Sequence, residues 1–591
     1  MTPVSSRAVN PVTFTRRPLV SAISLLLLTS VLGAVLFIAL RSPLKDDIAW
    51  LLYVAHRWMA GRELYIDVVE VNPPLIVWIS AIPLEIARWL DVGSQFVAMP
   101  VFVAAVLACA WWAATLLRPC GGLFVDRLPV FAAIGSALLV LPAADLGQRE
   151  HLLVAAFLPY LVLFAQSLGH SRPDWKRARL ATASWWRLRR PVRQTGAAVG
   201  SGAVAEPGTS WTGTEFHASE PAADIAPEQS GIGAVTASKA RIAAYVVAGV
   251  LAGLGCALKP RYAAVFAVLE CVALTRGLRP WRVMPLVAGT TLVAYAGLVA
   301  FLCPAYLRRA VPMALALYGA TDVPFLTLLA DSALLLSGEA VAIGLLWLRR
   351  RSLPDYNLML TLVVFAATST VICFVDGKDW YYHRLPATVI TVLALLLWSA
   401  TELVQRRWRI RWPLIAAGLA VTVFCVSSIQ QLEPEAIDAV EPKQTAVDRL
   451  EQILRAEHAR TYIAFSEWIA LGFPVVNETG VTWASRFDSM WALKGEVWRA
   501  RFDPAVAKEW PIARWVAHDF IAGCPDIAVV DTRETTNYIS VLRAADGAFA
   551  RAWSRYRRIA AFDGLVVYRR GKGGCFDVWV AADAKPVIEP P

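Results

Sequence analysis

The chain has 591 residues, of which 57% are hydrophobic, and a mean hydropathy of +0.51. This apolar fraction exceeds the roughly 45–50% of soluble domains, so a purely soluble globular protein is excluded. The net charge is +11, but the basic residues lie mostly in short loops between apolar runs, the positive-inside pattern of membrane proteins. A nucleic-acid partner is therefore not predicted. The nine cysteines show no Cys-X-X-Cys and no zinc-site spacing.

The first apolar run, Leu19–Leu40, is long enough to cross a bilayer. No small-residue cleavage site follows it, so it is predicted to be retained, with residues 1–18 in the cytoplasm. The next residues, 41–95, are predicted to form an outer loop in which Ile48–Met59 is an amphipathic helix at the membrane interface.

The segment Leu75–Leu90 is apolar but short, and it contains Pro83 and two charged residues. If it crossed the membrane, the basic stretch Arg172–Arg193 would face outward, against the positive-inside rule. It is therefore predicted to be an interfacial or partly embedded helix and not a span, and the second span is predicted at Phe96–Leu117.

Residues 19–430 are predicted to form an all-α transmembrane domain of about eleven helices, with the amino terminus inside and the carboxy terminus outside. Residues 170–241 are predicted to be a cytoplasmic insertion, disordered in its Gly-, Ser- and Pro-rich second part. Residues 431–591 are predicted to be a periplasmic α/β domain, and Cys524 and Cys575 within it are compatible with a disulfide. Its predicted elements are a helix at Val447–Arg460 and strands at Tyr462–Phe465, Ile527–Val530 and Leu565–Tyr568.

Four carboxylates gather in the first outer loop: Asp46, Asp47, Asp67 and Glu70, followed by Asn72-Pro73-Pro74. Two adjacent carboxylates raise each other's pKa when they are partly desolvated, which suits a general base or a cation ligand. The alternative is that the first pair caps a helix. For Asp67 and Glu70 the alternative is a turn with solvated acids. The double proline stiffens the backbone that leads into the next helix.

Polar clusters also stand at the outer ends of later spans. In Gln148-Arg149-Glu150-His151, Arg149 could bind phosphate through two parallel hydrogen bonds, and His151 could join Glu70 in binding a divalent cation. The alternative for this cluster is anchoring of a helix end.

Two further clusters place cations outside, against the positive-inside bias. In Lys259-Pro260-Arg261-Tyr262 the cations could stabilise a departing phosphate, with interfacial snorkelling as the alternative. In the cluster 378–384, Lys378, Tyr382, His383 and Arg384 could stack on a sugar and bind phosphate. The alternative for its aromatic residues is the ordinary interfacial belt.

The first outer loop resembles that of the GT-C glycosyltransferases, which include protein O-mannosyltransferases, the aminoarabinose transferase that modifies lipid A, and lipopolysaccharide-core transferases. The resemblance covers about fifty residues. Two departures leave metal use and donor identity open: the second acid is Asp where Glu is usual, and Asn72 replaces the His or Lys before the prolines. The matching residues are Asp46-Asp47-Ile48-Ala49-Trp50, Gly61, Tyr65, Asp67 and Glu70-Val71-Asn72-Pro73-Pro74-Leu75.

The resemblance implies an inverting hexosyl- or pentosyltransferase of the inner membrane. Its donor would be a polyprenyl-phosphate sugar and its acceptor an envelope glycan, a glycolipid or a protein. Asp46 matches the residue proposed as general base and Asp47 the family's second acid; Lys259, Arg261 or Arg384 would hold the leaving phosphate. No cofactor is required, apart from the divalent cation considered above.

Two other functions are compatible with this composition. A transporter or flippase for a lipid-linked glycan would also need many spans and outer charges. It should in addition carry ionisable residues in mid-span and internal repeats, neither of which is clear in the sequence. The second is a non-catalytic subunit of envelope assembly, which loss of the acidic loop would favour; that loop is present.

Overall fold

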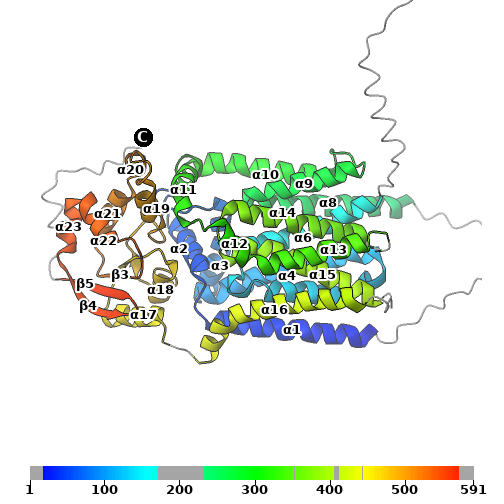
Figure 1. Cartoon of the computed structure of the whole chain (residues 1–591), viewed down its shortest axis with the longest axis horizontal. Helices are drawn as coiled ribbons and strands as arrows, with labels where there is room; N and C mark the ends of the chain where they lie inside the picture. The colour runs from blue at the N-terminus through cyan, green and yellow to red at the C-terminus, as the bar shows by residue number, and fades with distance from the viewer. Residues whose placement is uncertain are drawn as a thin grey trace, which may run out of the picture.

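The structure is a computed structural model that describes residues 17–571 apart from 171–230, 352, 354, 405–410 and 442–443. Long helices run side by side in a bundle, and a smaller domain with a β-sheet sits at one end of it (Figure 1). Most of the predicted insertion at 170–241 lies outside the described residues. Its last part does not, because helix α8 already begins at Gly231.

Eight helices in the described part of the chain are long and apolar enough to cross a membrane. In lipid a helix satisfies every backbone polar group internally, which is why apolar runs of this length form helices. A bent pair, Tyr306–Thr321 with Phe325–Asp331, would make a ninth span. The fold class is confirmed, whereas the count of eleven stays a prediction. The eight are α1 (Arg17–Arg41), α4 (Ser94–Leu117), α6 (Arg149–His170), α8 (Gly231–Leu258), α10 (Val283–Leu302), α14 (Tyr356–Asp376), α15 (Tyr381–Val404) and α16 (Arg411–Val440).

Shorter helices complete the bundle and the end of it that faces the small domain. Helix α2, the predicted amphipathic helix, and α3, at the segment predicted to be interfacial, lie between the long helices and the small domain (Figure 1). The shorter elements are α2 (Asp46–Met59), α3 (Pro74–Leu90), η1 (Arg118–Cys120), η2 (Gly122–Val125), α5 (Arg127–Val140), η3 (Ala143–Asp145), η4 (Pro260–Tyr262), α9 (Ala263–Thr275), η5 (Tyr306–Ala310), α11 (Val311–Leu317), η6 (Tyr318–Thr321), α12 (Phe325–Asp331) and α13 (Ala333–Leu348).

The small domain has a five-stranded sheet in the order β2-β1-β3-β5-β4. Strands β1, β2 and β3 are parallel, and β5 and β4 continue the sheet antiparallel. The three predicted strands are confirmed as β1, β3 and β5. Its elements are α17 (Ala446–Ala456), β1 (Thr461–Phe465), η7 (Ile469–Leu471), α18 (Val475–Thr479), β2 (Thr482–Trp483), α19 (Trp491–Arg499), α20 (Val506–Glu509), α21 (Ile512–Gly523), β3 (Ile527–Asp531), α22 (Tyr538–Ala545), α23 (Gly547–Trp553), β4 (Tyr556–Phe562) and β5 (Leu565–Arg570).

The sheet packs against helices through large apolar side chains. The ring of Phe465 on β1 lies 5.8 Å from that of Phe520 on α21 and 5.7 Å from that of Trp553 on α23. Cys524, which follows α21, is disulfide-bonded; Cys575 lies outside the described residues. The small domain therefore has an apolar core of its own.

The small domain docks directly on α2 and on the acidic loop that follows it. Asn477 Nδ2 donates to the backbone oxygen of Ala49 at 3.1 Å, and the backbone nitrogen of Val69 donates to the backbone oxygen of Arg486 at 2.7 Å. The rings of Trp50 and Phe473 are 4.9 Å apart. These contacts fix the sheet domain against the acidic loop of the bundle.

One glycine allows close approach of the two parts. A Cβ built on Gly495 of α19 would lie 2.6 Å from the backbone oxygen of Leu317 at the end of α11. We expect Gly495→Ala to weaken this contact by about 1–3 kcal/mol, because backbone has to shift, and to lower the Tm of the purified protein. Gly547→Ala, where the nearest atom is the end of the Arg551 side chain at 3.7 Å, is the control. Equal Tm values for the two variants would contradict the prediction.

Candidate active site

A cavity of about 760 Å³ lies where the bundle meets the small domain. Its bundle side is formed by the start of α2, the loop at 70–72, the segment before α6, the start of α15 and the end of α16. Its other side comes from the small domain, at positions 467–469, 488–491 and 531–534. The cavity is therefore shared between the helix bundle and the small domain.

The two adjacent carboxylates stand at the start of α2 and both line the cavity. Neither is the helix cap, because Lys45 holds that position without a side-chain bond. Asp46 Oδ1 accepts a hydrogen bond from the backbone nitrogen of Asp47 at 2.9 Å, and Asp47 Oδ2 accepts one from Gln148 Nε2 at 3.0 Å. The helix N-terminus favours negative charge here.

Two carboxyl groups on the bundle side of the cavity have their pKa raised toward neutral pH. Burial and the neighbouring charge of Asp46 together raise the pKa of Asp47 to about 7, against the opposing effect of Arg149. Burial likewise raises the pKa of Asp145, at the end of η3, to about 7 despite the attraction of Lys45. A carboxyl poised in this range is suited to proton transfer at neutral pH.

Glu70 is buried and already satisfied by its neighbours. Its carboxylate accepts hydrogen bonds from Trp50 Nε1 at 2.5 Å, from the backbone nitrogen of Asn72 at 2.8 Å and from the side-chain amide of Asn72. Burial raises its pKa, against the effect of Arg149. Tyr65 donates to the backbone oxygen of Asn72 at 2.8 Å. Glu70 thus stiffens the wall of the cavity, and the predicted contacts of Glu70 and Asn72 with a substrate stay predictions.

Asp67 lies in a turn. Its Oδ2 accepts a hydrogen bond from the backbone nitrogen of Glu63 at 3.0 Å, at an exposed position. Among the described residues that line the cavity, Asp67 is absent. Its predicted role in substrate binding gains no support from this position and stays a prediction.

Arg149 is a cation of the bundle whose charge lowers the pKa of both Asp47 and Glu70. It begins α6, lines the cavity and is 9% exposed. Within the described chain its Nε makes no hydrogen bond and lies 4.0 Å from the nearest oxygen of Glu150. Its guanidinium lies 6.0 Å from the ring centre of Tyr382, which also lines the cavity. A buried guanidinium with an unused donor is suited to bind an oxyanion.

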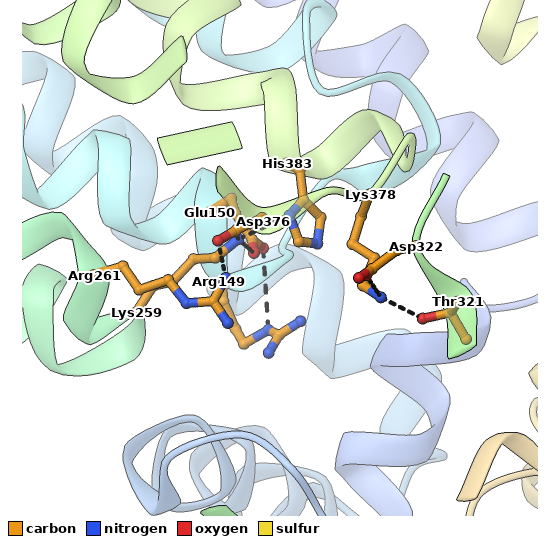
Figure 2. Close-up of polar contacts among 9 residues, drawn as sticks. All are labelled: Arg149, Glu150, Lys259, Arg261, Thr321, Asp322, Asp376, Lys378 and His383. Atoms are coloured by element: carbon orange, nitrogen blue, oxygen red, sulfur yellow. Dashed lines mark hydrogen bonds and ion pairs between the residues drawn. The ribbon is translucent and has the colours of Figure 1, made fainter. Parts of the chain in front are cut away.

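Lys259 and Arg261 form ion pairs with acidic side chains (Figure 2). Lys259 Nζ lies 2.8 Å from Glu150 Oε1 and 3.4 Å from Asp376 Oδ2, and Arg261 pairs with the same aspartate. His383 Nδ1 lies 3.0 Å from Asp376 Oδ2. Burial lowers the pKa of Lys259, although Glu150 opposes this. None of these five residues is among the described residues that line the cavity. The predicted contact of Lys259, Arg261 and His383 with a substrate therefore stays a prediction.

Lys378 and Arg384 make hydrogen bonds within the protein, and their predicted contact with a substrate stays a prediction. Lys378 Nζ donates to the backbone oxygen of Tyr318 at 2.8 Å, to Asp322 Oδ1 at 2.5 Å and to Thr321 Oγ1 (Figure 2). Arg384 donates to two backbone oxygens, one of them that of Asp379 at 2.9 Å. These bonds hold the segments that border the cavity.

Tyr262 is fully buried, and its ring lies 6.3 Å from that of Phe365 on α14. That position suits packing between helices. The described cavity lining does not contain Tyr262, and its predicted contact with a substrate stays a prediction.

The predicted cation site at Glu70 and His151 has little support in the geometry. Nδ1 of His151 accepts a hydrogen bond from the backbone nitrogen of Gly147 at 3.1 Å, and His151 is not among the described residues of the cavity lining. The described part of the chain contains no group of three or more His, Cys, Asp or Glu side chains that could hold a metal ion. These residues do not fit a metal site, and we derive no metal-dependent step.

Sequence reasoning missed several residues of the cavity. Asp488 comes from the small domain, and burial together with the charge of Glu70 raises its pKa to about 8. It accepts a hydrogen bond from Trp491 Nε1 at 2.9 Å. Asp145 could have been found as a polar residue that interrupts an apolar run. Nothing in the sequence separates Asp488 from the other polar residues of a polar domain.

Comparisons with known proteins gave results for solved structures only. No family model matches the chain, and no curated protein does. Among solved structures, the chain is similar to ArnT from Cupriavidus metallidurans bound to undecaprenyl phosphate. The match has 12% identity and a TM-score of 0.49, and it covers 93% of this chain and 98% of that one. A likeness of this degree carries no argument about function. The function is therefore inferred from the residues of the cavity.

Proposed function

We propose that this protein is a glycosyltransferase of the inner membrane that moves a sugar from a polyprenyl-phosphate donor to an acceptor outside the cytoplasm. One observation carries the proposal: Asp46, Asp47 and the partly unpartnered Arg149 share one cavity at the boundary between the bundle and the outer domain. A carboxylate pair can take a proton, and a guanidinium can hold a phosphate. The position at the end of the bundle suits a donor whose lipid stays in the membrane.

The reaction is a displacement at the anomeric carbon. Asp46 accepts the proton of the acceptor hydroxyl while the acceptor oxygen bonds to the anomeric carbon. The bond from that carbon to the phosphate oxygen breaks, and its electron pair leaves with the polyprenyl phosphate. Arg149 stabilises the negative charge that develops on this phosphate. Attack opposite the leaving group inverts the anomeric configuration.

Asp47 acts beside Asp46 and sets the pH range of the reaction. When Asp47 ionises, its charge makes the pair a stronger base. We assign the leaving phosphate to Arg149, since Lys259 is already held by Glu150 and Asp376. Lys259 and Arg261 then contribute at longer range through the field of their cluster.

Donor turnover tests the proposal. The full-length protein, in lipid nanodiscs, is incubated with undecaprenyl-phosphate sugars labelled in the sugar, one hexosyl and one pentosyl series, together with membrane extract as acceptor source. We expect label to move to an acceptor with release of undecaprenyl phosphate. Transport of intact donor across proteoliposomes without such release would favour a flippase. If the protein neither releases undecaprenyl phosphate nor transports the donor, an assembly subunit is favoured.

The pH dependence of transfer follows from Asp47. Its pKa is raised to about 7, so the group is neutral below that pH and ionised above it. We expect kcat/KM to rise between about pH 6 and pH 8 with a midpoint near 7, as Asp47 becomes charged. Asp47→Asn should remove this step, whereas Asp145→Asn should keep it. A step that survives Asp47→Asn and disappears in Asp145→Asn would reverse the assignment.

A further inference from the structure

The small domain directs the carboxyl ends of two parallel strands toward the cavity. Glu467 and Trp468, just after β1, line the cavity, and so do Asp531, Arg533 and Glu534 at the end of β3. In sheets with parallel strands, the carboxyl ends are where ligands commonly bind. We call these five residues and Ser466 the strand-end platform.

Hydrogen bonds make this platform rigid. Ser466 Oγ lies 3.0 Å from Asp531 Oδ2 and 2.7 Å from Glu534 Oε1. The backbone nitrogen of Trp468 donates to Ser466 Oγ at 3.0 Å. Arg533 Nε donates to Asp531 Oδ1 at 2.8 Å. The two strand ends are thus tied together, and little conformational freedom remains to be lost when a ligand binds.

Trp468 is the aromatic group that this platform presents. Its side chain is 43% exposed although most large apolar groups of the domain are buried, and the guanidinium of Arg533 lies 5.2 Å from its ring centre. Trp491 of the same domain and Trp380 of the bundle also line the cavity. Flat aromatic faces beside carboxylate acceptors suit a sugar ring, whose C–H face packs on the aromatic ring and whose hydroxyls donate to carboxylates.

The charge of the cavity limits which sugars can enter. Acidic groups outnumber basic groups three to one, and they remain in excess when the four acids with raised pKa values, Asp47, Glu70, Asp145 and Asp488, are counted as neutral. An anionic ligand is therefore disfavoured away from Arg149. The acidic residues are Asp46, Asp47, Glu70, Asp145, Glu435, Glu467, Asp488, Asp531 and Glu534, and the basic residues are Lys45, Arg149 and Arg533.

We propose that the strand-end platform is the acceptor subsite, and that the acceptor presents a neutral or cationic glycan to it. This inference rests on the proposed function, in which the bundle side of the same cavity holds the donor phosphate. The small domain then determines the specificity for the acceptor, and the bundle determines the specificity for the donor.

Binding of three matched disaccharides tests the inference. The full-length protein in nanodiscs is titrated with N,N′-diacetylchitobiose, which is neutral, with chitosan disaccharide, which is cationic, and with digalacturonate, which is anionic, by saturation-transfer NMR at low salt. We expect the neutral and cationic sugars to bind at least about tenfold more tightly than the anionic one. Trp468→Ala should weaken their binding about tenfold, and Trp468→Tyr should retain most of it.

Phe502→Ala is the matched control, because Phe502 is 72% exposed in the same domain and does not belong to the described cavity lining. It should bind the disaccharides as the wild type does. Equal binding of the anionic and neutral sugars, or no binding of any sugar, would overturn the inference, as would equal binding by wild type and Trp468→Ala. Binding of undecaprenyl phosphate is measured in parallel: if it persists while the sugars fail, only the inference falls, and if it too is absent, the proposed function falls with it.

Discussion

Asp46→Asn is expected to lower the rate of sugar transfer by about 10²–10⁴-fold, the usual contribution of a general base. Asparagine keeps the size of the side chain and can still accept a hydrogen bond from the backbone nitrogen of Asp47, the contact that Asp46 makes now. The lost function is therefore proton acceptance. The measurement is single-turnover release of undecaprenyl phosphate from labelled donor, with the Kd for undecaprenyl phosphate determined on the same preparation.

The Kd is expected to stay within about threefold of the wild type, since the donor phosphate is assigned to Arg149 and not to Asp46. Asp91→Asn is the control: Asp91 caps α3 in the left-handed conformation, which asparagine also adopts readily. Transfer at the wild-type rate by Asp46→Asn would remove Asp46 from the mechanism. Loss of transfer by Asp47→Asn alone would then make Asp47 the base.

Arg149→Ala is expected to weaken binding of undecaprenyl phosphate by about 10–100-fold, because the phosphate loses its charged hydrogen-bond donor. The affinity of Arg149→Lys for undecaprenyl phosphate should fall between those of the wild type and Arg149→Ala, since an ammonium group keeps the charge but not the planar pair of donors. Titration of undecaprenyl phosphate into the nanodisc-bound protein measures both. Removing Arg149 also leaves Asp47 and Glu70 without the charge that lowers their pKa values.

That second effect supplies an independent readout. The midpoint of the pH profile should move upward in Arg149→Ala, as the pKa of Asp47 rises further. Arg88→Gln, a change at an exposed residue of α3 that pairs with Glu85, should alter neither quantity. Should Arg149→Ala bind undecaprenyl phosphate normally while its pH midpoint rises, Arg149 serves to balance the acids. The phosphate site would then have to be sought at the cluster of Lys259 and Arg261.

Much of the fold was predictable because its signals are local. Apolar runs of bilayer length predict helices such as α1 and α4, and the apolar runs of β1, β3 and β5 predict strands. Strand β4 was missed because Arg557 and Arg558 break the apolar pattern at its start. The turn at Asp563-Gly564, where both residues have positive φ, could have indicated the hairpin. The number of spans depends on how shorter and bent helices sit, which apolar length does not determine.

The candidate site was predictable where polar residues contrast with an apolar background. Asp46, Asp47, Glu70 and Arg149 stand out beside long apolar runs, and the structure places all four on one cavity. The sequence could not show which cations have partners: Lys259 looked free and is held by Glu150. It also could not identify residues of the outer domain, because their approach depends on how two separately formed cores dock.

The division of the cavity between two cores has a consequence for how such a protein can diversify. The loops after β1 and β3 extend from the carboxyl ends of two neighbouring strands. The register of these strands is set by backbone pairing, so the loops can change sequence without disturbing the bundle. A chimera that exchanges only those loops should acquire a new target while it keeps its lipid carrier. Libraries randomised at positions 467, 468, 533 and 534 would be a compact starting point for engineering enzymes that decorate chosen surface polymers.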